Sequence, residues 1–239
     1  MRFEMRIVIV LNDKSTREGI IAKHGLSILL DNGGFRILFD MGPDEKSLEN
    51  NMLRLGIDAS KVDVAVVSHP HSDHYGGFKH VAWENPHLTT YIPYGSMNTL
   101  GKLIRSYDLM PFETLKTVEL AKDTYLTGPF YGPPFEHYLV HDLGDELLVV
   151  SGCLHPGVES LREVSSIFHK KIGVLIGGYH LRNAPDEVIK RTVDSMITQL
   201  GIRRLIPLHC TGDRAVSYME ERYRSSLIKA GGGFELNLP

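Results

Sequence analysis

Residues 68–77 read Ser-His-Pro-His-Ser-Asp-His-Tyr-Gly-Gly, a segment dense in side chains that bind metal ions. His69, His71, Asp73 and His74 place four potential ligands within six residues. The His and Asp content of the chain would give this pattern by chance in roughly one sequence of this length in five hundred. Imidazole and carboxylate groups suit zinc, iron or manganese. We therefore favour a metal site over the alternative of a polar loop with solvated histidines.

Because these candidate ligands follow a strand, their spacing indicates which of the side chains can point toward the same ion. The apolar run at residues 62–67 predicts a buried strand that ends directly before the cluster. Residues two apart in extended backbone point the same way, so His69 and His71 can bind one ion together. A helix that begins near Asp73 would turn Asp73 and His74 toward a second position. The two glycines that follow allow the backbone to pass close to the ions.

Three more histidines, His155, His180 and His209, each follow an apolar run typical of a strand. The runs cover residues 146–150, 172–176 and 204–208. Loops at strand ends are common places for functional sites. Any one of these histidines alone would be an ordinary core or loop residue. Their shared position, in a chain that also carries the four-ligand cluster, predicts that they belong to one site.

The remaining pattern predicts an α/β fold with a hairpin-rich front and a strand–helix–strand rear. Further strands are expected at residues 6–11, 26–30 and 35–39, with Asp-Asn-Gly-Gly at 31–34 as a hairpin turn. Helices are expected at residues 43–55, 158–168 and 187–200, the last with Pro185 in its first turn and Gly201 as its stop signal. Residues 128–134, rich in Gly and Pro, are expected to be a surface insertion, with a domain boundary as the alternative.

The composition excludes several classes of protein. The 239 residues include 26 Lys and Arg against 29 Asp and Glu, so the net charge of −3 gives no reason to expect a nucleic-acid partner. No apolar run approaches the ~20 residues that span a bilayer, so no membrane association is expected. The first residues do not resemble a signal peptide, and two cysteines cannot form a disulfide framework, so we expect a cytoplasmic protein. Nothing in the sequence determines the oligomeric state.

Two motifs resemble the metallo-β-lactamase fold superfamily. The His69-x-His71-x-Asp73-His74 pattern is the hallmark of that superfamily. The sequence Phe-Asp-x-Gly at residues 39–42 resembles a strand–Asp–Gly motif that precedes this pattern in the superfamily. The Asp of that motif usually contacts the metal ligands, not the metal, and so orients them. By this resemblance Asp40 would orient the ligands here.

Three later segments resemble one branch of the superfamily, the 7,8-dihydropterin-6-methyl-4-(β-D-ribofuranosyl)aminobenzene-5′-phosphate synthase-like family. They are residues 151–157, 177–181 and 207–212. The resemblance runs in order from about residue 5 to residue 235. It implies a four-layer αββα sandwich, with two mixed sheets face to face and helices outside. It also implies a single domain over residues 1–239, made of two pseudo-equivalent halves with the metals at one sheet edge.

The resemblance also assigns metal ligands. His69 and His71 would bind the first ion, and Asp73 and His74 would bind the second. His209 matches the last ligand of the superfamily, on the second ion. Two divalent ions, with zinc expected and iron or manganese as alternatives, would be the cofactor.

The middle of the pattern departs from the superfamily. Many relatives end a strand there with Gly-Asp, and that Asp bridges both ions, whereas this chain has Gly152-Cys153. Cys153 is either a bridging thiolate or a buried small residue, and His155 would complete the first ion. His180 is a further ligand or a substrate contact, with the contact favoured, and Cys210 is expected to be structural. The loop at 128–136 lacks an Arg that family members often carry, which leaves the substrate open.

Such a pair of ions clamps attacking and leaving oxygens and lowers the pKa of a water from 15.7 to about 7. Asp73 could orient the nucleophile as well as bind metal, and His180 could protonate a leaving group. Arg182 is either a phosphate contact or a solvated charge at a helix end. We therefore expect a hydrolase or transferase whose substrate is a phosphorylated small molecule.

Three functions follow in order of preference. The first is the reaction named by the family, which joins a dihydropterin diphosphate to an aminobenzene ribofuranosyl phosphate and releases diphosphate and carbon dioxide. The second is hydrolysis of a phosphoester or another ester-like bond. The third belongs to another class, a di-iron redox or oxygen-handling protein, which usually has carboxylate-rich ligands and a flavin partner domain that this sequence does not contain.

Overall fold

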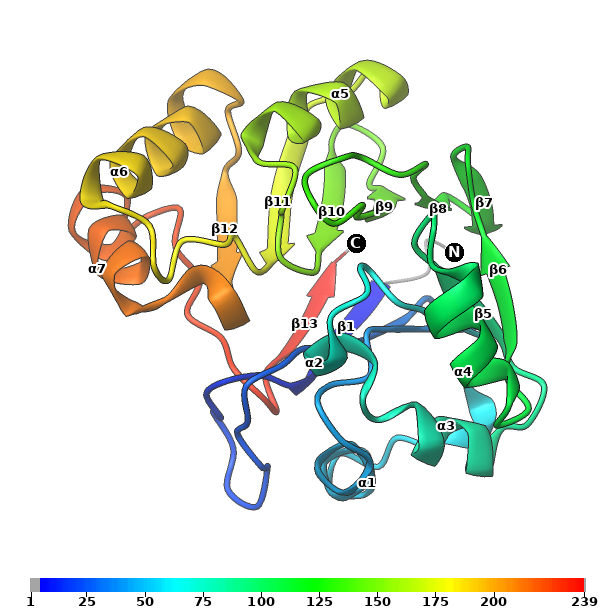
Figure 1. Ribbon diagram of the computed structural model, residues 1–239. Coiled ribbons are helices and arrows are strands. Elements are labelled where there is room, and N and C mark those ends of the chain that lie inside the picture. Colours follow the sequence, from blue (N-terminus) through cyan, green and yellow to red (C-terminus); the bar gives the residue numbers. More distant parts are fainter. Residues whose placement is uncertain (1–4, 239) are drawn as a thin grey trace. The chain divides into compact units, whose positions relative to one another are not determined.

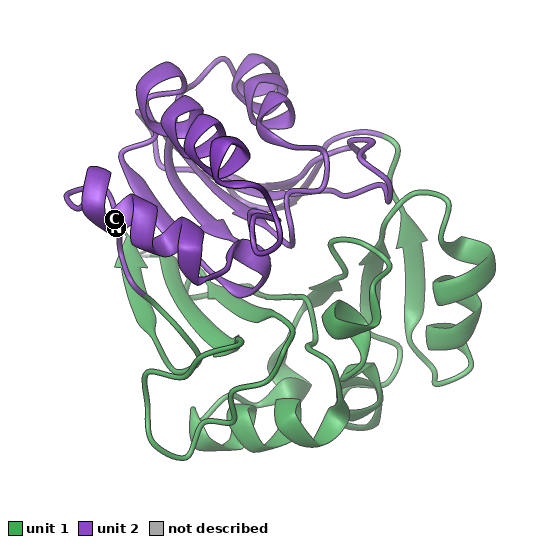
Figure 2. Ribbon diagram, turned by 60° about the vertical axis from the view of Figure 1, so that its left-hand side comes forward, with its two compact units in different colours: residues 1–115, 230–239 green, residues 116–229 purple. Residues whose placement is uncertain are grey.

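The computed structural model describes residues 5–238, which divide into two compact units. The first unit contains the chain up to Leu115 together with the segment from Ala230 onward, and the second contains Lys116–Lys229 (Figure 2). The divisions between these units fall near residues 115 and 229, and residues 128–134 lie inside the second unit. The single domain over residues 1–239 stays a prediction.

The described part of the first unit contains a seven-stranded mixed sheet in the order β13-β1-β2-β3-β4-β5-β6 (Figure 1). The strands are β1 (Met5–Leu11), β2 (Ser27–Asp31), β3 (Arg36–Phe39), β4 (Val64–Val66), β5 (Thr89–Ile92), β6 (Met110–Glu113) and β13 (Glu235–Leu238). β13, β1, β2 and β3 pair antiparallel, while β3, β4, β5 and β6 pair parallel. The strand nearest the end of the chain therefore pairs with β1, at one edge of this sheet.

The helices of the first unit pack on one face of its sheet. They are α1 (Glu45–Arg54), α2 (Ser72–Tyr75), α3 (Phe78–Glu84) and α4 (Lys102–Arg105), with a 3₁₀ turn at Ala59–Lys61 and a π-helical turn at Met97–Gly101. α1 begins at Asp44, whose side chain accepts a hydrogen bond from the Ser47 N–H. Buried Leu48 and Met52 of α1 pack in one core with alternate strand residues such as Val8 and Val10.

The described part of the second unit contains a six-stranded mixed sheet in the order β12-β11-β10-β9-β8-β7. The strands are β7 (Val118–Ala121), β8 (Thr124–Leu126), β9 (Leu139–Asp142), β10 (Leu147–Ser151), β11 (Ile172–Gly177) and β12 (Arg204–Pro207). β10, β11 and β12 are parallel neighbours, and the other pairs are antiparallel. Two mixed sheets with helices confirm the α/β class that the sequence predicts.

The helices of the second unit share one core with its sheet. They are α5 (Val158–Phe168), α6 (Asp186–Asp194) and α7 (Asp213–Arg222), with a π-helical turn at Ser195–Gln199 and a 3₁₀ turn at His209–Thr211. The helix expected at 187–200 continues only as a π-helical turn after Asp194. The Thr198 hydroxyl donates to the Asp194 carbonyl at 2.6 Å and competes with the regular helical bond there. Gly201 then takes a φ of +68°, as its expected role as a stop signal requires.

Several short strands were not anticipated from the sequence. They are β5 to β9 and β13, each of three or four residues. Segments this short carry too few residues for an alternating pattern to emerge. Among residues 5–238, no helix is long and apolar enough to cross a membrane.

The packing of α5 provides a test of the fold of the second unit. Leu161 is fully buried against the sheet, whereas Ile167 on the same helix is half exposed. We expect Leu161→Ala to lower the free energy of unfolding by about 2–5 kcal/mol, because it leaves a cavity in the core. Ile167→Ala should change that energy by no more than about 0.5 kcal/mol. Urea denaturation measures both, and equal small effects would contradict this packing.

Candidate metal centre

The ends of two parallel strands position the ligand cluster of the first unit. Phe39 at the end of β3 lies in register with Val66 at the end of β4. The segments that follow, at residue 40 and at residues 67–69, therefore leave the sheet at the same edge. In α/β sheets, ligands bind at the carboxyl ends of the strands. α2 begins directly after His71, which confirms the expected helix near Asp73.

Asp40 is the centre of the hydrogen-bond network in this unit. Its fully buried carboxylate accepts hydrogen bonds from the Ser68 N–H at 2.7 Å, from the Ser68 hydroxyl at 2.8 Å and from His74 Nδ1 at 2.6 Å. Ser68 was not singled out in the sequence, although it directly precedes the motif. Through these bonds one carboxylate fixes both ends of the segment that carries the four candidate ligands.

This network also fixes which imidazole nitrogens can bind a metal. The Ser68 hydroxyl donates its proton to Asp40, so its oxygen can accept a hydrogen bond from His69 Nδ1, 2.9 Å away. His74 donates through Nδ1 to Asp40. Both rings therefore present the lone pair of Nε2. A ligating histidine almost always donates its other ring nitrogen to a carboxylate or similar group in this way.

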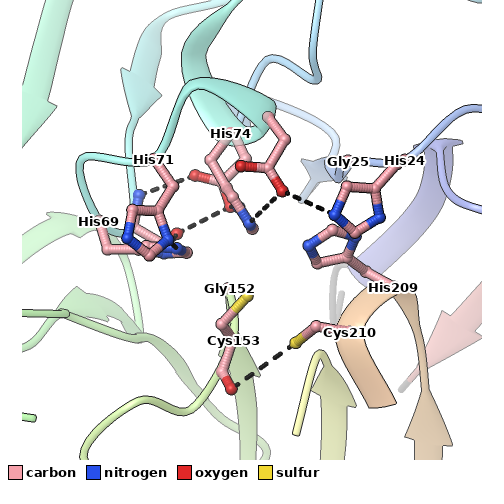
Figure 3. A network of polar contacts seen from close by, with 12 residues as sticks. His24, Gly25, His69, His71, His74, Gly152, Cys153, His209 and Cys210 are labelled. Carbon is pink, nitrogen blue, oxygen red and sulfur yellow. Dashed lines mark hydrogen bonds and ion pairs between the residues drawn. The ribbon is translucent and has the colours of Figure 1, made fainter. Parts of the chain in front are cut away.

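The structure brings the four residues of the motif together (Figure 3). His69 Nε2 lies 3.0 Å from His71 Nδ1, and the ring centroids of His69 and His74 lie 4.1 Å apart. Asp73 Oδ2 lies 3.8 Å from His74 Nε2. These pairwise distances link three imidazoles and a carboxylate, groups whose chemistry fits zinc, iron or manganese.

His24 is a neighbour of this cluster that the sequence analysis missed. Its Nε2 lies 3.4 Å from Asp73 Oδ2, and its Nδ1 lies 2.9 Å from Asp13 Oδ2. Gly25 packs against the same residue, because a Cβ there would lie 2.5 Å from the Asp73 carbonyl oxygen. No spacing pattern links His24 to the motif, so only the structure could place it beside Asp73.

The two glycines after the motif allow two backbone segments to pass close to each other. A Cβ at Gly76 would lie 2.0 Å from the Pro43 carbonyl oxygen, and one at Gly77 would lie 2.1 Å from that of Met41. The close passage is therefore between α2 and the backbone segment that follows Asp40. This close packing holds the motif against the segment that follows Asp40.

In the second unit, the carboxyl ends of three parallel strands position the candidate ligands. Ser151 of β10 lies in register with Gly177 of β11, and Gly177 with Pro207 of β12. The loops directly beyond these residues carry Cys153, His155, His180 and His209. The sequence interpretation that each histidine follows a strand is confirmed for β10, β11 and β12.

Hydrogen bonds join the loops of β11 and β12. The N–H groups of Leu181 and Arg182 donate to the Cys210 carbonyl at 3.1 and 3.0 Å. Arg182 Nη2 donates to the His209 carbonyl at 2.8 Å. Arg182 lies in the turn before α6, which begins at Asp186, rather than at a helix end. Its guanidinium group thus holds the backbone of a candidate ligand.

Cys210 and Cys153 are both buried, and the Cys210 thiol lies 3.8 Å from the Cys153 carbonyl, a contact drawn in Figure 3. Ligand atoms of Cys153, His180 and Cys210 all lie within 4.8 Å of one another. The rings of His155 and His180 have centroids 4.4 Å apart. Thiolate and imidazole groups at such distances fit a zinc ion.

The thiol of Cys210 has an unusual ionisation. Burial alone would raise its pKa, but hydrogen bonds with Cys153 and His180 and the nearby His209 outweigh burial and hold the pKa well below the usual value. The hydrogen bond with Cys210 in turn raises the pKa of His180, against the effect of desolvation. The structural role expected for Cys210 stays a prediction.

Glu136 is a second residue that the sequence analysis missed. It is fully buried and accepts hydrogen bonds from the backbone of the loop that carries Cys153 and His155. The sequence does hold a signal, because Glu136 is a lone acidic residue in the otherwise apolar and aromatic run Phe-Glu-His-Tyr-Leu-Val. An acidic residue in such a run is buried only with partners.

Backbone strain is also present in these segments. Of the eight non-glycine residues with a positive φ in the described part of the chain, four lie here: Asp40 (60°), Leu154 (56°), His180 (53°) and His209 (45°). Such conformations cost about 1–3 kcal/mol each and cluster at functional sites. They persist here because the hydrogen bonds of both units hold the loops in place.

The sequence pattern of the metallo-beta-lactamase superfamily matches residues 21–160. The chain therefore belongs to the metallo-β-lactamase superfamily, as the motifs predict.

One relative of known name and two solved structures are similar to this chain over nearly its whole length. Over an alignment 262 positions long, gaps included, the chain is 27% identical to the 7,8-dihydropterin-6-methyl-4-(beta-D-ribofuranosyl)-aminobenzene-5'-phosphate synthase of Methanocaldococcus jannaschii, and 89% of each protein is covered. Its fold is similar to that of Tm1679, described as a metal-dependent hydrolase of the beta-lactamase superfamily (TM-score 0.82, 24% identity, 97% of this chain and 98% of the other). It is also similar to a diphosphatase from the PhnP family (TM-score 0.67, 13% identity, 98% and 97%).

The Asp40 network predicts the effect of a single change. In Asp40→Asn, an NH₂ group replaces one acceptor oxygen and faces a donor of Ser68 or His74. We expect the free energy of unfolding to fall by about 1–3 kcal/mol and zinc affinity to fall about 10- to 100-fold. Thermal unfolding and competition with a coloured chelator measure the two effects.

Asp108→Asn is the matched control for this change. Asp108 is exposed and has a φ of 65°, which Asn tolerates as well as Asp does. Zinc affinity of Asp40→Asn equal to that of Asp108→Asn would show that Asp40 does not orient a ligand.

Proposed function

We propose that this chain is a metal-dependent enzyme that acts on a small molecule carrying a phosphate or diphosphate group. Its proposed cofactor is a pair of divalent ions, zinc in the first instance, with iron and manganese as alternatives. When bound, such ions act as Lewis acids toward phosphate oxygens and make a water acidic enough to ionise near neutral pH.

The observation that carries this proposal is the orientation of two buried imidazoles. Nδ1 of His74 is bound to Asp40 and Nδ1 of His69 to Ser68, so in both rings the lone pair that would bind a metal ion is on Nε2. A carboxylate or hydroxyl group that fixes the tautomer from the other ring nitrogen is typical of ligating histidines. This arrangement supports a metal-binding role over that of a polar loop.

The proposed roles in the first unit follow the motif. His69 and His71 are ligands of one ion, and Asp73 and His74 of the other. Asp73 also orients the nucleophile, through the carboxylate oxygen that it does not use for metal. Asp40 keeps His74 in the tautomer that a ligand needs.

The proposed roles in the second unit rest on the strand ends and on the resemblance to the superfamily. His155 is a ligand of the first ion and His209 of the second. Cys153, as a thiolate, takes the place where many relatives have a bridging Asp. The short distances between Cys153, His180 and Cys210 support a ligand role for Cys153 over that of a buried small residue.

Two further residues are proposed to act on the substrate. His180 is exposed at the end of its loop, where it can reach a bound molecule and protonate a leaving group. Arg182 is the proposed phosphate contact, because a planar guanidinium group matches phosphate geometry. Its hydrogen bond to the His209 carbonyl fixes the position of the guanidinium group next to a candidate ligand.

The preferred reaction is the condensation that the resemblance to the synthase-like family implies. It is supported by the relative from Methanocaldococcus jannaschii, which is named as such a synthase and aligns with this chain over 89% of each protein. The substrates implied by that family are a dihydropterin diphosphate and an aminobenzene ribofuranosyl phosphate. Hydrolysis of a phosphoester or similar bond is the second candidate. It is favoured by the similarity of the fold to a metal-dependent hydrolase and to a diphosphatase.

The metal-binding proposal predicts the behaviour of His71→Ala. The side chain of His71 is exposed, so the fold should survive the change. Elemental analysis of the wild type should give close to two ions per chain, and the variant should lose at least one ion and all turnover. His80→Ala on α3 removes an imidazole outside the motif and should keep both. Full turnover in His71→Ala would refute the catalytic proposal.

A second experiment separates the two reactions. The purified enzyme is incubated with the dihydropterin diphosphate, with and without the aminobenzene ribofuranosyl phosphate, and released diphosphate is measured. Release that requires the second compound indicates condensation. Release without it indicates hydrolysis, and no release in either case excludes both of these substrates.

A further inference from the structure

We propose that Glu136 is a positioning residue that forms the loop of residues 152–155 before any metal ion binds. The proposal deepens the proposed function and rests on it in one respect, the ligand roles of Cys153 and His155. None of the motifs described above contains this glutamate.

Four successive backbone amides converge on the carboxylate. Glu136 Oε1 accepts from the N–H groups of Gly152, Cys153 and Leu154 at 2.9, 2.9 and 3.0 Å. Oε2 accepts from the His155 N–H at 2.8 Å. Both oxygens act as acceptors, the role of an ionised carboxylate. Hydrogen bonds from amides to a charged acceptor are about twice as strong as neutral ones.

The conformation of the loop matches this acceptor. Successive N–H groups in a segment with a left-handed residue form a concavity that binds anions. Leu154 supplies that residue with a φ of 56°. A left-handed conformation is unfavourable for leucine, so the hydrogen bonds to Glu136 explain why Leu154 keeps it.

The carboxylate is itself held on a fixed support. The backbone of Glu136 pairs with that of Phe130 through two hydrogen bonds, of 2.8 and 3.0 Å. The next residue but one, Tyr138, is fully buried and stacks on the Phe130 ring at 5.2 Å. The Tyr138 hydroxyl lies 2.8 Å from the Ser160 hydroxyl, at the start of α5.

The other side of the loop is also fixed. The Ser160 hydroxyl donates to the Gly157 carbonyl at 2.6 Å. A Cβ at Gly132 would lie 2.3 Å from Pro156, so the loop of residues 131–135 presses directly on the residue after His155. Glu136 therefore connects the paired backbone of Phe130 and Glu136 to the loop of residues 152–155. The loop is already ordered by these contacts, so binding of a metal ion would restrict its conformation little further.

The first test compares Glu136→Gln with Glu146→Gln, the same change at a glutamate of the same unit that pairs with Arg203 near the surface. In Glu136→Gln, the new side-chain amide would direct its NH₂ group at one of the donors that the carboxylate accepts. We expect Co²⁺ affinity of the full chain, followed by absorbance, to fall about 10- to 100-fold in this variant. The thiolate-to-cobalt band should also weaken or shift, and Glu146→Gln should match the wild type in both respects.

Equal Co²⁺ affinity and an unchanged spectrum in Glu136→Gln would overturn the positioning role while the wild type still binds metal. A wild type that binds neither Co²⁺ nor Zn²⁺ would instead refute the proposed function. These two failures are therefore distinguishable.

The second test needs no variant, so it decides the question even where Glu136→Gln does not fold. Amide hydrogen exchange of residues 152–155 is measured by NMR in the wild type, with and without Zn²⁺. We expect these four amides to be protected to the same degree, within about threefold, in both states. Fast exchange in the metal-free chain, with protection only after Zn²⁺ is added, would show that the metal organises the loop and would overturn the proposal.

Discussion

The first unit depends on one buried carboxylate. Asp40 leaves the sheet at the end of β3, and its two oxygens accept three hydrogen bonds from Ser68 and His74. Without these partners a buried charge would cost several kcal/mol, so the network must form as a whole or not at all. Because these partners lie in the motif or directly before it, the same hydrogen bonds contribute to the stability of this unit and orient its candidate ligands. A change that loosens one also loosens the other.

In the second unit, too, a buried carboxylate is satisfied by hydrogen bonds, but from a different group of donors. Glu136 is also buried and acidic, but its partners are four backbone amides rather than side chains. In both units a carboxylate sits behind the loop that follows a parallel strand and fixes the direction of that loop. Imidazole nitrogens and thiols can then be presented on loops, which would otherwise be the most mobile parts of the fold.

The sequence was sufficient for the elements and side chains with a strong local signal. The motif at residues 69–74, the hairpin at 31–34 and the strands before His155, His180 and His209 were all readable, because their spacing or periodicity is local. The partners of Glu136 and His24 were not, because each acts on segments elsewhere in the sequence. For Glu136 the sequence signals a buried acid, but only the folded chain shows which groups it binds. The short strands β5 to β9 were not predicted for another reason. Three or four residues are too few to show the alternation of apolar and polar residues that identifies a strand.

The pairing of β13 with β1 has a consequence for synthesis of the chain on the ribosome. β1 emerges before the other strands of its sheet, but its partner at the sheet edge follows the whole of residues 116–229. At ordinary rates of translation that interval is on the order of ten seconds. During it the nascent first unit carries an unprotected edge strand, the kind of surface that recruits chaperones or other nascent chains. The contiguous second unit, in contrast, can complete its own sheet as soon as it leaves the exit tunnel.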